Sequence, residues 1–215
     1  MSPTLLLLLK HALMLLVCIA GDKLPLVVQK PHLLRAVIDN ASHAFIGLIA
    51  TEIVVHHYKD QLAKHQMYGL IATGFVLSSV IDLDHFIEAK SLHLEDATSL
   101  NRRPFLHNSS IFLVLLGSII VAVGLQQHVI LSLWLSVTFV AFFTHQLRDA
   151  IRRGFWFRAP YLDYSTAPVL YWVYLTLTQL CPHALIQLLA MQERRGRFLP
   201  VIDDRGVKYK PLDVV

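Results

Sequence analysis

The sequence predicts an all-α, multi-pass transmembrane helical bundle of five to six spans, and two observations carry this prediction. Of its 215 residues, 55% are hydrophobic and only 16% are charged, with a mean hydropathy of +0.53, whereas about a quarter of the residues in soluble domains are charged. The apolar residues also gather into segments close to the length of about 20 residues that a helix needs to cross a bilayer. We identify six such segments: roughly 4–28, 40–57, 66–86, 109–126, 128–146 and 166–190. Residues 1–190 are predicted to form a single transmembrane helical domain, and residues 191–215 an exposed, flexible tail.

The first two segments are the least regular. Gly21-Asp22-Lys23 breaks the first segment, and Lys10 and His11 interrupt its apolar run. No basic region precedes it, which favours a membrane helix over a cleaved signal, although Cys18-Ile19-Ala20 before Gly21 leaves cleavage as an alternative. The second segment is predicted to be the shortest and the least apolar.

The later segments are joined by connections of very different lengths. The second and third are linked by residues 58–65, and the fourth and fifth by Gln126-Gln127, so each pair is predicted to be an antiparallel helical hairpin. We call the side of the membrane that holds these two tight turns side A, and the opposite side, which holds the longer loops 24–39, 87–108 and 147–165, side B.

Basic residues concentrate on side B, which predicts that this side faces the cytosol. Ten lie there, against Lys59 and Lys64 on side A. The ten are Lys23, Lys30, Arg35, Lys90, Arg102, Arg103, Arg148, Arg152, Arg153 and Arg158. Six full spans would, however, place the basic tail after residue 190 on side A. Either the last segment is re-entrant, or the first does not span, or the orientation is reversed.

Charge and cysteine usage exclude several classes of function. The formal charge of +4 comes from basic residues between apolar segments, where membrane topology explains them, so we predict the lipid bilayer as partner and no nucleic acid. Cys18 and Cys181 both lie within apolar segments, which provides neither a disulfide framework nor a thiolate metal site.

Four polar clusters lie at the borders of apolar segments, and all four fall on side B. They are Asn40-Ala41-Ser42-His43, Asp82-Leu83-Asp84-His85, Arg102-Arg103-Pro104-Phe105-Leu106-His107 and His145-Gln146-Leu147-Arg148-Asp149. An up-and-down bundle brings the start of one span and the end of the next to the same level. Ionisable groups at membrane depth are costly and typically functional, so the sequence predicts one shared polar site on side B.

The spacing within these clusters suits a metal ion. Asp82 and His85 are three residues apart, and His145 and Asp149 are four apart, which places each pair on one helix face. Helical bundles build metal centres from inward carboxylates and imidazoles of this kind. A mixed His/Asp site suits zinc, manganese or iron.

Simpler interpretations of the same residues stay open. Asp39, Asn40 or Ser42 could cap the second span, and Arg102 or Arg103 could form an ion pair with Asp82 or Asp84. The remaining histidines are predicted to have no role in the site; they are His11, His32, His56, His57, His65, His93, His128 and His183. Glu52, well inside a span, could face either the site or a partner helix.

These clusters resemble the uncharacterised transmembrane protein 267 family of animals. The resemblance rests on residues 78–86, 102–107 and 145–156, with Asp39-Asn40-Ala41-Ser42-His43 fitting too, and covers roughly residues 35–175. It implies a multi-pass membrane protein and brings no established activity.

More distantly, the pattern is similar to a prokaryotic family of inner-membrane proteins described as metal-dependent hydrolases. That family carries Pro-Asp-x-Asp-His, His-Arg-Gly-x-x-His-Ser and Ser-His-x-x-x-Asp. The matching positions here are His43, Asp82, Asp84, His85, His107, His145 and Asp149. Three positions depart from the pattern: Ile81 replaces Pro, Arg102 replaces the first His, and Asn108 replaces Ser.

The resulting prediction is a metal-dependent hydrolase, degenerate or active, that acts on a phosphate-bearing lipid or lipid-linked substrate. Its metal ligands would come from His43, Asp82, His85, His107, His145 and Asp149. Asp84 would be the general base, and Arg103, Arg148 and Arg152 would hold the substrate phosphate in a phospholipid headgroup. The alternative is a non-catalytic scaffolding membrane protein with a buried His/Asp/Arg network. A carrier or channel is disfavoured because the clusters lie on one side.

Overall fold

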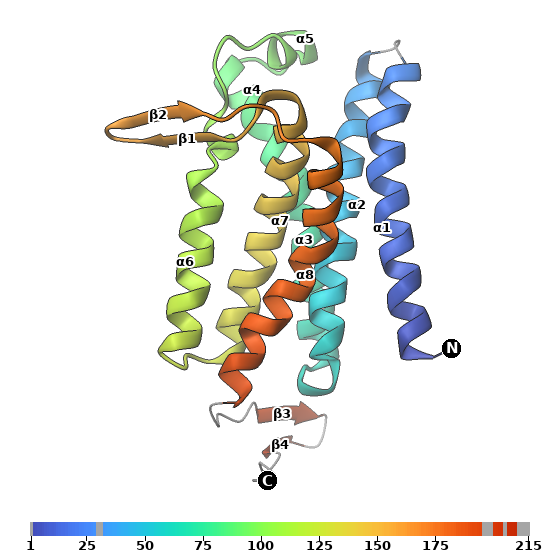
Figure 1. The fold of residues 1–215 in the computed structure, drawn as a ribbon, viewed down its shortest axis with the longest axis vertical. Coiled ribbons are helices and arrows are strands. Elements are labelled where there is room, and N and C mark those ends of the chain that lie inside the picture. Colours follow the sequence, from blue (N-terminus) through green and yellow to red (C-terminus); the bar gives the residue numbers. More distant parts are fainter. Residues whose placement is uncertain (1, 29–31, 195–199, 204–205, 210–215) are drawn as a thin grey trace.

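Six long helices form the up-and-down bundle of the computed structural model, which describes residues 2–28, 32–194, 200–203 and 206–209, and side chains through Gln192 (Figure 1). They are α1 (Pro3–Val27), α2 (His32–His57), α3 (Lys64–Val80), α6 (Ser110–Gly124), α7 (Val129–Arg153) and α8 (Tyr171–Arg194). Five apolar helical stretches are long enough to cross a membrane, and α6, at 15 residues, is shorter. The predicted all-α, multi-pass bundle of five to six spans is confirmed.

The short elements gather mostly at side B. There α3 continues through the 3₁₀ turn η2 (Ile81–Leu83) into α4 (Asp84–Ala89), followed by α5 (Leu94–Thr98) and η3 (Phe105–His107). The antiparallel hairpin of β1 (Trp156–Ala159) and β2 (Leu162–Ser165) lies at the same end (Figure 1). Side A holds the turn η1 (Lys59–Gln61) and the paired strands β3 (Pro200–Asp203) and β4 (Gly206–Tyr209).

The prediction for the second span needs correction. Helix α2 begins at His32 and has 26 residues, so it is not the shortest span. Residues 32–39 continue the helix with exposed Leu33, Leu34 and Val37. Ser42 therefore lies inside the helix, where its hydroxyl donates to the carbonyl of Ile38 at 2.7 Å. The suggested helix caps at residues 39–42 are wrong, and the His43 cluster lies within the bundle instead.

Helix α8 ends on side A, because both α1 and α8 run the length of the bundle (Figure 1). The last segment is thus a continuous helix that does not turn back, and the first extends along the whole bundle. Arg194 and the β3–β4 hairpin that contains Lys208 lie on side A. The excess of basic residues on side B over side A is therefore smaller than the count over the connecting loops alone indicated. The cytosolic location of side B stays a prediction. The predicted exposure and flexibility of residues 191–215 fall largely outside the described residues.

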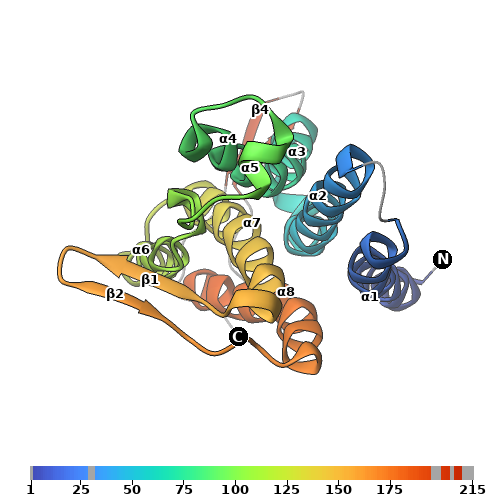
Figure 2. The same ribbon diagram turned by 90° about the horizontal axis from the view of Figure 1, so that it is seen from above.

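Helix α7 lies at the centre of the bundle, with α2, α3, α6 and α8 around it (Figure 2). Small residues bring α2 and α3 into close contact: a Cβ on Gly47 would lie 1.9 Å from the Ser78 hydroxyl, and one on Gly74 would lie 2.1 Å from the Thr51 hydroxyl. Such contacts are typical of membrane helix pairs. This packing fixes the position of the C-terminal end of α3. Asp82, Asp84 and His85 come directly after it in the chain.

Candidate metal centre

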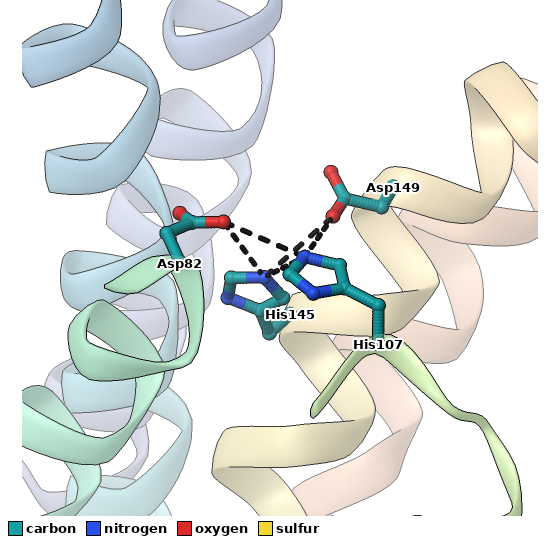
Figure 3. A group of neighbouring side chains, drawn as sticks. All are labelled: Asp82, His107, His145 and Asp149. Atoms are coloured by element: carbon teal, nitrogen blue, oxygen red, sulfur yellow. Dashed lines mark hydrogen bonds and ion pairs between the residues drawn. The ribbon is translucent and has the colours of Figure 1, made fainter. Parts of the chain in front are cut away.

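Four side chains from three segments converge where α7 passes the end of α3 (Figure 3). Helix α7 provides His145 and Asp149 from consecutive turns, η2 provides Asp82, and η3 provides His107. One nitrogen or oxygen atom from each of the four lies within 4.8 Å of the others. We call this group the four-ligand site. The predicted gathering of side B residues into one site is therefore present in the fold.

The distances in the four-ligand site have a narrow range. His107 Nε2 lies 3.5 Å from Asp82 Oδ1 and 3.3 Å from Asp149 Oδ2. His145 Nε2 lies 3.4 Å and 3.6 Å from the same two oxygens. The two Nε2 atoms are 3.3 Å apart. Four ligands about 2.1 Å from a tetrahedral zinc ion lie about 3.4 Å from one another, so these five distances match such a site.

His145 is held in the orientation that metal binding needs. Its side chain is fully buried, and its Nδ1 lies 2.9 Å from the backbone carbonyl oxygen of Ser78. This hydrogen bond requires the proton on Nδ1, so Nε2, which is directed at Asp82 and Asp149, is the nitrogen that would bind a metal ion. Metal-binding histidines typically donate their second ring N–H in this way.

His107 is oriented by Asp84, a fully buried carboxylate at the start of α4. Asp84 Oδ2 accepts a hydrogen bond from the backbone N–H of Leu106 at 2.7 Å and lies 3.3 Å from His107 Nδ1. Burial lowers the pKa of His107, but its hydrogen bonds with Asp149, Asp82 and Asp84 outweigh burial and raise that pKa to about 11. Without a metal ion, a proton on His107 thus supplies the positive charge that these carboxylates require.

The position of Asp84 differs from the one its predicted role requires. A pocket opens onto the four-ligand site from outside. The Asp84 side chain is fully buried and does not line this pocket, so it has no contact with water there. Asp84 is placed to orient His107, and its role as general base stays a prediction.

The two other predicted ligands lie beside the four-ligand site. The His43 ring stacks on His145 with ring centroids 3.8 Å apart, and its Nε2 lies 3.6 Å from Asp149 Oδ1. His85 lies on the other side, with its ring centroid 4.7 Å from that of His107. All six predicted ligands are thus neighbours in the structure, four of them in one group.

The four arginines that were predicted from the sequence to bind phosphate or to pair with the carboxylates have different positions. Arg152 lines the pocket and also bonds to Asp39 Oδ1 at 3.0 Å. Arg148 is fully buried, with its guanidinium bonded to Asp22 Oδ1 at 2.9 Å and to Asp39 Oδ1 at 2.8 Å. Arg148 does not line the pocket, so its predicted phosphate-binding role has no geometric support. Arg102 is exposed and, within the described part of the chain, forms no ion pair with Asp82 or Asp84. The suggested Arg102 pairing is therefore wrong, because the loop turns that side chain outward.

Arg103 lies at the rim of the pocket and also holds the end of α7. It donates to the carbonyl oxygen of Gly154 at 3.0 Å and to that of Arg153. Burial and the nearby charge of Arg153 lower the pKa of Arg103. Arg103 also lines the pocket, and its role in binding phosphate stays a prediction.

A pocket of about 160 Å³ opens onto the four-ligand site. Asp82, His107 and Asp149 line it, while His145 lies fully buried beneath them. Arg103, Arg152 and Arg153 line the same pocket. A metal ion at this site would therefore be reachable from outside, next to three cationic side chains.

The sequence did not reveal two polar contacts of α1. Asp22, treated as a break in an apolar segment, is the partner of the buried Arg148. His11 and His183, treated as scattered, lie with their Nε2 atoms 2.8 Å apart. Glu52 pairs with Lys10 of α1 at 2.6 Å, which settles that it faces a partner helix. A charged residue inside an apolar segment signals a buried partner of opposite charge, but it does not say which one.

Proteins named transmembrane protein 267 are similar to this chain over most of its length. The one from Danio rerio is 38% identical over 171 residues, covering 77% of this chain and 73% of the relative. Those from Bos taurus and Mus musculus are each 33% identical, over 176 and 172 residues, covering 78% and 77% of this chain and 76% and 75% of the relatives. No family model and no solved structure matches the chain. These names state a membrane location and no activity, so the distant resemblance to hydrolases stays a prediction.

Proposed function

This chain belongs to the transmembrane protein 267 family, and we propose that it is an integral-membrane, metal-dependent hydrolase of a phosphate-bearing lipid or lipid-linked substrate. The observation that carries the proposal is the set of five distances of 3.3–3.6 Å between the ligand atoms of the four-ligand site. Four of the five distances join a nitrogen and an oxygen, and these are longer than the distance of about 2.9–3.0 Å most common for N–H···O hydrogen bonds. They are well spaced to enclose a divalent cation.

The donor set favours zinc, with manganese and iron as alternatives. Two imidazole nitrogens and two carboxylate oxygens in a near-tetrahedral arrangement are typical of zinc, whereas manganese and iron accept the same ligands with additional oxygens. The described site contains no thiolate, since Cys18 and Cys181 are buried elsewhere in the bundle.

The residues of the pocket suit hydrolysis of a phosphate ester. A divalent cation here would lower the pKa of a water molecule that joins the four protein ligands as a fifth ligand. Asp82 and Asp149, the carboxylates that line the pocket, are the groups within reach to accept the water proton. The water oxygen would form a bond to phosphorus as the ester P–O bond breaks, and the leaving alkoxide would take up the proton held by Asp82 or Asp149. Arg152 and Arg153 would hold the phosphate oxygens, because guanidinium groups match them in pairs.

A lipid substrate fits the position and size of the pocket. The site lies near the side B end of helices whose outer faces expose many apolar side chains, such as Leu113 and Val114 of α6. A volume of about 160 Å³ accommodates a phosphate group but no acyl chain. The apolar part of the substrate would stay in the bilayer while its phosphate enters the pocket.

One observation favours the non-catalytic alternative. With a proton on His107, the three surrounding carboxylates already have a cationic partner, so the fold can be stable without a metal ion. In that case the site would be a buried polar network in a scaffolding membrane protein.

Metal content and hydrolysis by the purified protein separate the two alternatives. Tag-free protein in lipid nanodiscs is loaded with zinc, manganese or iron, and unbound ion is removed by gel filtration. We expect at least one ion per chain by elemental analysis, one ion fewer in His145→Ala, and no change in His93→Ala, which removes an exposed histidine on the same side. Phosphate release from phospholipids should require the ion. Folded protein without bound metal would support the scaffold instead.

A further inference from the structure

A second group of ligand atoms lies directly beside the four-ligand site. It consists of Asp84, His85 and His107, with one ligand atom from each within 4.8 Å of the others. Asp84 Oδ1 lies 3.3 Å from His85 Nδ1 and 3.3 Å from His107 Nδ1. This oxygen is buried and accepts no hydrogen bond from any described residue. A buried carboxylate oxygen without a donor is costly, which indicates that a ligand belongs there.

We propose that Asp84, His85 and His107 form a second divalent-cation position, so that the two ring nitrogens of His107 contact two different cations. The inference rests on the proposed function, because the first position is the four-ligand site. Nε2 of His107 faces Asp82 and Asp149, whereas its Nδ1 faces Asp84. One imidazole thus connects both groups of ligands.

Binding of two cations by the His107 ring requires the ring to lose a proton. A neutral imidazole carries one ring proton. For both nitrogens of His107 to bind cations, that proton must leave to solvent, and the ring becomes an anionic imidazolate. Two adjacent dications favour the loss, because bound cations strongly favour the deprotonated form of their ligands. His85 Nδ1, 3.2 Å from the carbonyl oxygen of Asp82, would exchange that contact for the second cation.

The charges of the surroundings match two cations. Asp82, Asp84 and Asp149 supply three negative charges, and the imidazolate of His107 supplies a fourth, against four positive charges of two dications. The neighbouring Arg148 contributes no excess, since Asp22 and Asp39 lie within 2.9 Å of its guanidinium. A single dication would leave the carboxylates only partly compensated.

A second cation would also define the reaction more closely. His85 lines the pocket together with Asp82 and Asp149, so both cation positions border the same space. Cations on the two nitrogens of one imidazole lie farther apart than the roughly 3.5–4 Å of closely paired two-metal sites, so the second cation would contact the substrate rather than share the attacking water. A second positive charge beside Arg152 and Arg153 would favour an anionic substrate such as a phosphate ester.

Manganese binding measured by electron paramagnetic resonance tests the inference without relying on activity. Tag-free, full-length protein in nanodiscs is titrated with Mn²⁺, and the bound ion is counted by elemental analysis. We expect two ions per chain, with a spectrum broadened by magnetic coupling through the shared ring. His85→Ala should bind one ion and show the six-line spectrum of isolated Mn²⁺, while His93→Ala should match the unmodified protein.

Each other outcome overturns the inference. Saturation at one ion per chain would remove the second position while leaving the proposed function intact. Two ions without magnetic coupling would place the second ion away from His107. No bound ion would overturn the inference and the proposed function together. Coupling in the unmodified protein decides the matter even if His85→Ala does not fold.

Discussion

Two polar clusters share one stretch of α7, and their hydrogen bonding differs. Arg148 faces α1 and α2, where Asp22 and Asp39 accept its hydrogen bonds at 2.8–2.9 Å. On another face of the same stretch, His145 and Asp149 face the four-ligand site, where the ion-pair distances are 3.3–3.6 Å. The arginine cluster is held by short hydrogen bonds. The four-ligand site has space between its donors and acceptors, and we take this contrast to separate a structural network from a binding site.

Removing the buried arginine should produce the largest change in stability. Arg148→Ala would leave Asp22 and Asp39 as buried carboxylates without their cation, which typically costs about 3–5 kcal/mol of unfolding free energy. The measurement is denaturant-induced unfolding in detergent micelles. Arg153→Ala, an exposed arginine on the same helix, serves as the control and should change stability by less than about 0.5 kcal/mol. Equal effects of the two variants would contradict a structural role for the arginine cluster.

Removing a ligand should instead affect metal binding more than folding. His145→Ala takes away one of the four donors, and we expect the zinc affinity of its site to fall by more than the roughly 10–100-fold typical of residues that merely support a ligand. In metal-free protein the same change should cost less stability than Arg148→Ala. Competition with a chromophoric chelator gives the affinity. If His145→Ala bound zinc like the unmodified protein, the four-ligand site would not be the binding site.

The two clusters should also respond differently to pH. Hydrogen bonds donated by His107 to the surrounding carboxylates outweigh the effect of burial and raise the pKa of His107 to about 11, so without metal this ring is protonated throughout pH 6–9. A cation must displace that proton, and its apparent affinity should therefore rise about tenfold per pH unit in this range. Zinc affinity measured at pH 6, 7 and 8 checks the slope. A pH-independent affinity would show that His107 is not a ligand.

The smallest expected effect concerns the pocket rim. Arg153→Ala removes an exposed guanidinium next to the pocket, and loss of one exposed contact to phosphate should lower kcat/KM for an anionic phospholipid by about tenfold or less. Metal content should stay unchanged, because this residue contacts no ligand atom of the four-ligand site. A matching fall in bound metal would mean that the residue acts on the site rather than on the substrate.

The sequence predicted the helices and their sides well where apolar segments have clear polar borders. The end of α3 at Asp82 and the passage of α7 through His145 follow from such borders, so the meeting of these residues could be inferred from span counting. The start of α2 was misplaced because His32–Asp39 mixes charged with apolar residues. In the structure this segment is the first part of the continuous helix α2. Counting apolar spans does not include the packing that keeps such a mixed segment helical.

Side-chain directions were much harder to predict. Arg148 and Asp149 are adjacent in the sequence, yet they face different clusters about 100° apart around the helix. The role of Arg148 depends on Asp22 of α1, a residue 126 positions away, and no local pattern links the two. Likewise, only the fold shows that Arg102 points outward while Arg103 reaches the end of α7.

The central claim is that the four-ligand site binds a divalent cation, and elemental analysis of tag-free, folded protein after zinc loading and gel filtration tests it most directly. The account predicts at least one zinc ion per chain and one fewer in His145→Ala. Folded protein that retains no zinc, manganese or iron under these conditions would contradict it.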